Sequence, residues 1–65
     1  MSVSKEIMNK IEGKLRRPVH INYIANYIVK LPIGETRNLL NKLVGMGIIE
    51  ESKYAKDYYV LKSQR

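Results

Sequence analysis

A proline at position 32 and a glycine at position 47 divide the middle of this chain into segments of defined length. Residues 22–30 carry apolar side chains at helical spacing, and residues 33–46 do so again after the proline. Proline is tolerated in the first turn of a helix, where its missing N–H would have no partner, and glycine supplies the left-handed residue that commonly ends one. Residues 20–51 therefore predict two helices joined by a tight turn at 31–34, the second of which leads into a strand.

The residues before this segment predict one more helix. Ser4 is a suitable N-cap, and Pro18 stops the helix because the residue before a proline avoids the α region. Apolar residues recur at every third or fourth position of this helix: Ile7, Met8, Ile11 and Leu15. That spacing predicts a single buried stripe on an otherwise charged helix.

Three short runs predict strands. Residues 48–51 and 58–61 are rich in β-formers and are joined by a polar loop at 52–57, which is the pattern of a β-hairpin. Residues 19–21 form an extended stretch that is too short to be stable alone. We expect this stretch to pair with the hairpin.

The same spacing predicts which side chains of the two central helices are buried. Asn22 is the expected N-cap of the first, which reaches Lys30. Its inward residues are Ile24, Ala25 and Ile28, and those of the following helix are Ile33, Thr36, Leu40, Leu43 and Val44, with Leu39 at the margin. Four tyrosines have two possible interpretations: Tyr23, Tyr27, Tyr58 and Tyr59. They could form a stacking platform for single-stranded nucleic acid, or they could lie at the edge of the core, and we favour the core edge.

Length and composition predict one small domain, 1–65, with a polyanionic partner. The chain has no cysteine, so disulfides and thiolate metal sites are excluded. Its net charge of +6 on 65 residues favours nucleic acid, although a soluble surface alone would also explain the charge. Neither a membrane span nor the apolar region of a signal peptide is present, so we expect a soluble cytoplasmic protein with no membrane association.

Catalytic and metal sites have little support in the sequence. An enzyme needs ionisable groups that converge in a pocket, but this chain has a single histidine, and its six acids are scattered. Glu50 and Glu51 are neighbours on a predicted strand and therefore point to opposite faces. His20 has no partner ligands at metal-binding spacing. We therefore predict no enzyme activity, no cofactor, no metal and no small-molecule effector.

The outward face of helix 33–46 has the side chains that read bases. Arg37, Asn38, Asn41 and Lys42 lie opposite the predicted core stripe. Arginine pairs with guanine and asparagine with adenine by two hydrogen bonds in the major groove. An ordinary solvated helix face would also carry such residues, and Glu35 departs from a uniformly basic surface.

The hairpin loop and the end of the first helix supply further cations. Lys53, Tyr54 and Lys56 lie in loop 52–57, where lysines would neutralise phosphates without specifying sequence. An ordinary soluble hairpin is the alternative. Arg16 and Arg17 are candidates for contact with flanking DNA backbone, although favourable placement at the helix C-terminus would also explain them.

The run ETRNLLNKLVGMGIIEE resembles the recognition helix and first wing strand of winged helix-turn-helix transcription regulators, including the MarR-like and ArsR-like groups. Thr36 and Arg37 occupy the start of that helix, and Gly47 and two isoleucines its end. The resemblance implies an α+β fold of three helices, a short strand and a C-terminal hairpin wing. It also implies major-groove contacts by Arg37, Asn38, Asn41 and Lys42, and we add Thr36 to the predicted contact residues.

These features together predict a small transcription regulator of archaeal or archaeal-virus type that binds double-stranded DNA. Helix 33–46 would enter the major groove, loop 52–57 would lie on adjacent backbone, and a homodimer would double the footprint. The chain departs from the pattern of these regulators in two ways: the wing has no arginine, and the long dimerisation helices are missing. Two alternatives stay open: a winged-helix protein-interaction module of a larger assembly, and a chromatin protein without sequence specificity.

Overall fold

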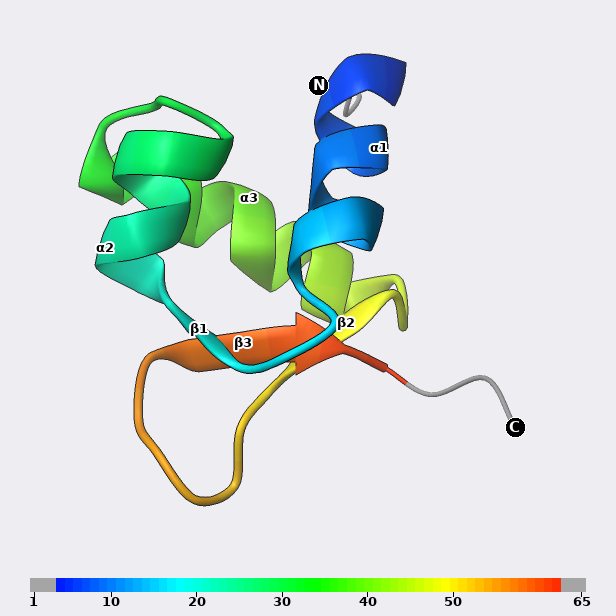
Figure 1. Ribbon diagram of the computed structural model, residues 1–65, viewed down its shortest axis with the longest axis vertical. Helices are drawn as coiled ribbons and strands as arrows, with labels where there is room; N and C mark the ends of the chain where they lie inside the picture. Colours follow the sequence, from blue (N-terminus) through cyan, green and yellow to red (C-terminus); the bar gives the residue numbers. More distant parts are fainter. Residues whose placement is uncertain (1–3, 63–65) are drawn as a thin grey trace.

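The computed structural model describes residues 4–62 and contains three helical segments and one three-stranded antiparallel sheet (Figure 1). The helical segments are α1 (Lys5–Lys14), α2 (Ile21–Tyr23) with its continuation η1 (Ile24–Ile28), and α3 (Ile33–Gly45). The strands are β1 (Val19–His20), β2 (Ile49–Glu51) and β3 (Tyr58–Leu61). The α+β class and the order of elements agree with the prediction, and the arrangement is compatible with a winged helix.

The sheet joins the start of the chain to its end. Its strand order is β1-β3-β2, so the short first strand pairs with the hairpin as predicted. Val19 lies opposite Tyr59 and His20 opposite Tyr58, while Ile49 lies opposite Leu61 on the other edge. In Figure 1 the helices lie above the sheet, and the loop between β2 and β3 projects below it.

Helix α1 begins and buries its apolar stripe as its sequence predicts. The Ile7 N–H donates to Ser4 Oγ at 3.1 Å, which is the expected N-cap. Ile11 and Leu15 are fully buried, and Ile7 and Met8 pack against the core from its edge. The helix ends at Lys14, with Leu15 as C-cap, earlier than the predicted stop at Pro18, so Arg16 and Arg17 lie after the helix.

The second helical segment differs from the prediction at both ends. Asn22 is not its N-cap; His20 is, because the Asn22 N–H donates to His20 Nδ1 at 3.0 Å. Pairing with β3 ends at His20, and the buried Ile21 already starts the helix. The π-helix η1 ends at Ile28, two residues before the predicted end, and Lys30 takes a left-handed φ of 57°.

Helix α3 has the predicted bounds to within one residue, but its buried stripe is narrower. Thr36, Leu40 and Leu43 are fully buried. Ile33 and Val44 were predicted to be buried but are 46% and 39% exposed. Successive helical residues are about 100° apart, so Val44 is turned away from the stripe that contains Leu43, and Ile33 stands in the first turn. Gly47 has the predicted left-handed conformation, with φ of 79°.

The tyrosines divide between core and surface. Tyr59 is 3% exposed and belongs to the core, as predicted. Tyr23 and Tyr27 were expected at the core edge but are 53% and 67% exposed. Ile24, Ala25 and Ile28 already fill the inward side of this helix, so Tyr23 and Tyr27, four residues apart, share its outward side.

Candidate nucleic-acid interface

The outward face of α3 presents the side chains that the sequence singled out. Arg37, Asn38, Asn41 and Lys42 are all exposed, since the buried stripe lies on the other side of the helix. A Cβ built on Gly34 or Gly45 would meet no atom within 4 Å. The α3 backbone is therefore open to a partner at both ends of this face.

Thr36 is a correction to the predicted contact residues. It is fully buried, and its Oγ1 donates a hydrogen bond to the Leu31 carbonyl at 3.2 Å. The spacing from Thr36 to Leu40 and Leu43 places all three on one side of the helix. Thr36 therefore fastens the start of α3 to the preceding turn and cannot contact a partner directly.

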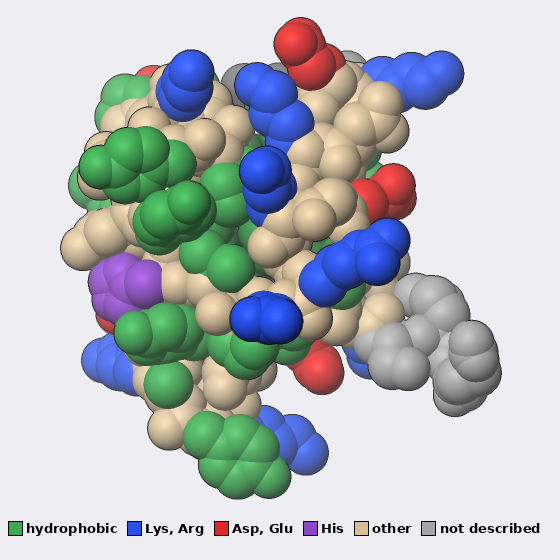
Figure 2. All heavy atoms as spheres, in the orientation of Figure 1, with side chains coloured by type: hydrophobic (Ala, Val, Ile, Leu, Met, Phe, Trp, Pro, Cys, Tyr) green, Lys and Arg blue, Asp and Glu red, His purple; other side chains and the backbone are tan. Residues whose placement is uncertain are grey.

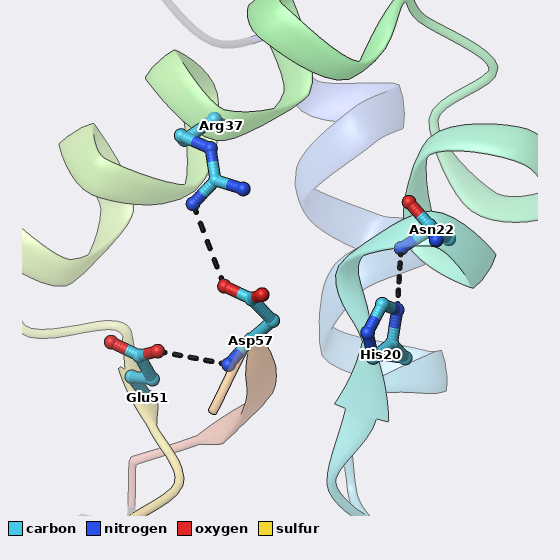
Figure 3. Close-up of polar contacts among 5 residues, drawn as sticks. All are labelled: His20, Asn22, Arg37, Glu51 and Asp57. Atoms are coloured by element: carbon cyan, nitrogen blue, oxygen red, sulfur yellow. Dashed lines mark hydrogen bonds and ion pairs between the residues drawn. The ribbon is translucent and has the colours of Figure 1, made fainter. Parts of the chain in front are cut away.

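An ion pair joins α3 to the base of the hairpin loop. Arg37 Nη1 lies 3.5 Å from Asp57 Oδ1, and the two side chains are 49% and 28% exposed (Figure 3). The helix face and the loop therefore meet at this point and can address one partner together. The sequence did not predict this contact, because nothing in the local pattern relates residues so far apart in the chain.

Asp57 connects two further parts of the fold to the loop through its backbone. It has a left-handed φ of 68°, and its N–H donates to Glu51 Oε2 at 3.0 Å (Figure 3). Its carbonyl accepts from the Ile21 N–H at 2.9 Å. Asp57 thus ties the loop to β2 and to the start of α2, while its side chain is left to face Arg37.

The hairpin loop carries exposed cations. Lys53 and Lys56 are exposed, and Tyr54 is 96% exposed. The loop is closed by the Ser52 N–H, which donates to the Tyr58 carbonyl at 2.7 Å, and by the Tyr54 N–H, which donates to Ser52 Oγ at 3.2 Å. A short closed loop holds the two lysines on the same end of the molecule as Asp57.

Arg16 and Arg17 are not brought together with the hairpin loop. The Leu61 N–H donates to the Leu15 carbonyl at 2.8 Å, which places the end of α1 beside the last residue of β3. The loop precedes the first residue of β3, Tyr58. The two arginines therefore lie toward the opposite end of this strand, and the open depression that they line extends from there to His20 and Tyr23.

Tyr59 lies buried near the Arg37–Asp57 pair, and this changes its acidity. Burial raises the pKa of Tyr59 above its ordinary value of 10.0, Glu51 and Asp57 raise it further, and Arg37 lowers it. At a pH between the ordinary and the raised pKa, Tyr59 is still protonated in the folded chain but already ionised in the unfolded chain. The fold is therefore sensitive to alkaline pH at this position.

We expect the free energy of unfolding to fall above pH 10.0, the ordinary pKa of tyrosine. Below that pH, Tyr59 is protonated in both the folded and the unfolded chain. Above it, Tyr59 ionises first in the unfolded chain, so the free energy of unfolding falls by up to about 1.4 kcal/mol per pH unit. This loss ends once the pH passes the raised pKa of Tyr59 in the folded chain. Urea unfolding of the native chain and of Tyr59→Phe from about pH 9 to about pH 11 measures this. Tyr59→Phe should show a flatter profile, and equal slopes would contradict the assignment.

Residues 4–62 contain neither a candidate metal site nor a candidate membrane-spanning helix. No group of three or more His, Asp or Glu side chains in this range is arranged to hold a metal ion. None of the helices in the same range has the length and apolar character needed to span a membrane.

Comparison of the chain with protein-family models, with curated proteins and with solved structures gave no significant match. The candidate interface therefore rests on its own geometry.

Proposed function

We propose that this chain is a small winged helix-turn-helix protein that binds double-stranded DNA and regulates transcription. Helix α3 enters the major groove, and the loop between β2 and β3 acts as a wing on adjacent backbone. The observation that carries the proposal is the contact between Arg37 and Asp57, because it puts the outward face of α3 next to the lysine-bearing loop. The net charge of +6 supports a polyanionic partner.

The exposed side chains fall into two groups, one suited to the base edges of DNA and one suited to its phosphate backbone. Arg37 suits guanine, and Asn38 and Asn41 suit adenine, because each can form two hydrogen bonds to a base edge. Lys53 and Lys56 suit phosphate, where they add affinity without base preference. Lys42 lies in the last turn of α3.

A homodimer completes the proposal. One winged helix reads few base pairs and binds weakly, whereas two copies related by a two-fold axis read two half-sites. The half-sites would lie about 10 base pairs apart, one turn of B-DNA, if the two α3 helices enter successive major grooves.

The salt dependence of binding tests the wing. The double variant Lys53→Ala/Lys56→Ala removes two predicted phosphate contacts, so affinity for a duplex of about 20 base pairs should fall at low salt. The slope of log K against log salt should become shallower by about 2, at roughly 0.9 per lost contact. Fluorescence anisotropy across a salt series measures both quantities.

A matched variant separates a local wing contact from a general charge effect. Lys5→Ala/Lys10→Ala removes the same number of positive charges from exposed positions of α1. We expect this control to change duplex affinity much less than the wing variant does. Equal losses for the two variants would contradict a wing contact, and undetectable duplex binding at about 0.15 M salt would end the proposal.

The second candidate function is a winged-helix protein-interaction module in a larger assembly. The exposure of Tyr23 and Tyr27 favours it, because exposed aromatic side chains are common at protein interfaces. This function predicts a stable complex that survives loss of the wing lysines. The wing variant therefore distinguishes the two functions: DNA binding depends on Lys53 and Lys56, and protein binding through the tyrosines does not.

A further inference from the structure

Two large aromatic rings stand exposed on the helix formed by α2 and η1. Tyr23 and Tyr27 are 53% and 67% exposed, and their ring centroids are 4.9 Å apart at an interplanar angle of 42°. The two rings contact each other, and about half or more of each residue stays exposed. This pair lies outside the duplex surface described above, since neither residue belongs to α3 or to the hairpin loop.

A second aromatic pair continues this surface onto the sheet. The rings of His20 and Tyr58 meet edge to face with centroids 5.1 Å apart, because β1 pairs with β3 at these two residues. Tyr58 is 36% exposed. His20 and Tyr23 line the same depression, so the two pairs are neighbours. We call Tyr27, Tyr23, His20 and Tyr58 the aromatic run.

Cations border the aromatic run on its α1 side. The depression has a volume of about 580 Å³, and its lining includes Lys14, Arg16 and Arg17. Within residues 4–62 no acidic side chain forms an ion pair with any of these three. Figure 2 shows the hydrophobic side chains gathered on the α2 side of this face and Lys and Arg side chains beside them toward α1. The face is therefore both aromatic and cationic.

The chemistry of this face selects among possible partners. A second copy related by a two-fold axis would bring Lys14, Arg16 and Arg17 close to their own equivalents, and that repulsion opposes a dimer here. Duplex DNA offers phosphates, but its bases are already stacked on one another. A single strand offers both unstacked bases for the rings and phosphates for the cations, which is the combination that such proteins use.

We propose that the aromatic run and its bordering cations bind single-stranded nucleic acid. Bases stack on the open faces of Tyr23 and Tyr27, and the phosphates between them lie against Lys14, Arg16 and Arg17. In the view of Figure 1, α3 lies behind α1 and α2, so this surface is separate from the proposed duplex surface. The proposal does not depend on duplex binding, and a chain with both surfaces can hold a single strand beside a duplex.

The test measures binding of a fluorescein-labelled oligo(dT) of about 15 nucleotides by anisotropy at about 0.15 M salt. The double variant Tyr23→Ala/Tyr27→Ala should weaken binding by about tenfold or more, because each stacked base contributes substantially to affinity. Tyr23→Phe/Tyr27→Phe keeps both rings and should bind within about twofold of the native chain. Tyr54→Ala, which removes a more exposed ring on the hairpin loop, should leave oligo(dT) binding unchanged. Circular dichroism checks that each variant is folded.

Three results would overturn the proposal. One is undetectable binding of oligo(dT) by the native chain, and another is equal binding by the alanine double variant. The third is a native dimer, seen by sedimentation velocity, that dissociates on Tyr23→Ala/Tyr27→Ala and would assign the face to a second copy. Parallel titrations with a mixed-sequence duplex keep the two surfaces distinguishable: Arg37→Ala should affect only the duplex, and the alanine double variant only oligo(dT).

Discussion

Arg37→Ala is expected to weaken binding to a preferred duplex by about 5- to 150-fold, or roughly 1–3 kcal/mol. The substitution removes the side chain best suited to guanine. It also leaves Asp57, which faced Arg37 at 3.5 Å, as an unpaired negative charge at the proposed DNA-binding surface. Selection from a randomised duplex pool supplies the preferred sequence, and anisotropy titration of that duplex and of an unselected one measures the change.

The partner residue offers a matched test of the same interaction. Asp57→Asn removes the charge but fits the left-handed φ of 68°, which asparagine tolerates well. Because the ion pair is half exposed, its loss should cost less than about 1 kcal/mol of folding stability. We expect Asp57→Asn to tighten duplex binding, and Asp57→Asn/Arg37→Ala to bind less weakly than Arg37→Ala alone.

The pool also separates sequence-specific binding from general DNA binding. If the native chain selects no preferred sequence, it is a chromatin protein of the non-specific kind, and Arg37 serves only as a cation. Loss of affinity confined to the selected duplex supports base reading by Arg37. Identical affinities of native chain and Arg37→Ala for both duplexes would remove α3 from the interface.

Leu40→Ala should abolish most of the stability of the fold. Leu40 is fully buried at the centre of the α3 stripe, and large-to-small substitutions at such sites cost about 2–5 kcal/mol. A domain of 65 residues has a total stability of roughly 3–10 kcal/mol, at 0.05–0.15 kcal/mol per residue. Urea unfolding followed by circular dichroism should show a midpoint near zero denaturant for this variant.

Val44→Ala is the matched control on the same helix. Val44 is 39% exposed, and alanine has the higher helix propensity, so its stability should stay within about 0.5 kcal/mol of the native value. A large loss at Val44 would mean that it is buried by a partner or a second copy in solution. A small loss at Leu40 would contradict the buried position of the α3 stripe.

The candidate site shows which functional features a sequence can reveal. The exposure of Arg37, Asn38 and Asn41 followed from helical spacing, since residues opposite a buried stripe must face solvent. The same spacing places Thr36 on the buried side of α3. Its inclusion among the predicted contact residues is therefore wrong, because a fully buried side chain cannot contact a partner directly. Whether any of these residues binds DNA stays a prediction.

Local sequence determined the elements of this protein. Ser4 as N-cap, Pro32 before α3 and Gly47 after it act over a few residues, so the order and most bounds of the helices and strands could be predicted. The faces that are buried also follow largely from spacing within each element, because periodicity is a property of a single segment.

Only the tertiary structure decided how those elements meet. The Arg37–Asp57 pair and the pairing of β1 with β3 both join segments that are distant in the chain. Such contacts are set by the packing of whole elements against one another, and no local spacing encodes them. Local signals such as the turn at Pro32 and the helix end at Gly47 therefore determined the helices and strands of the chain. The packing of these elements determined which side chains share a surface.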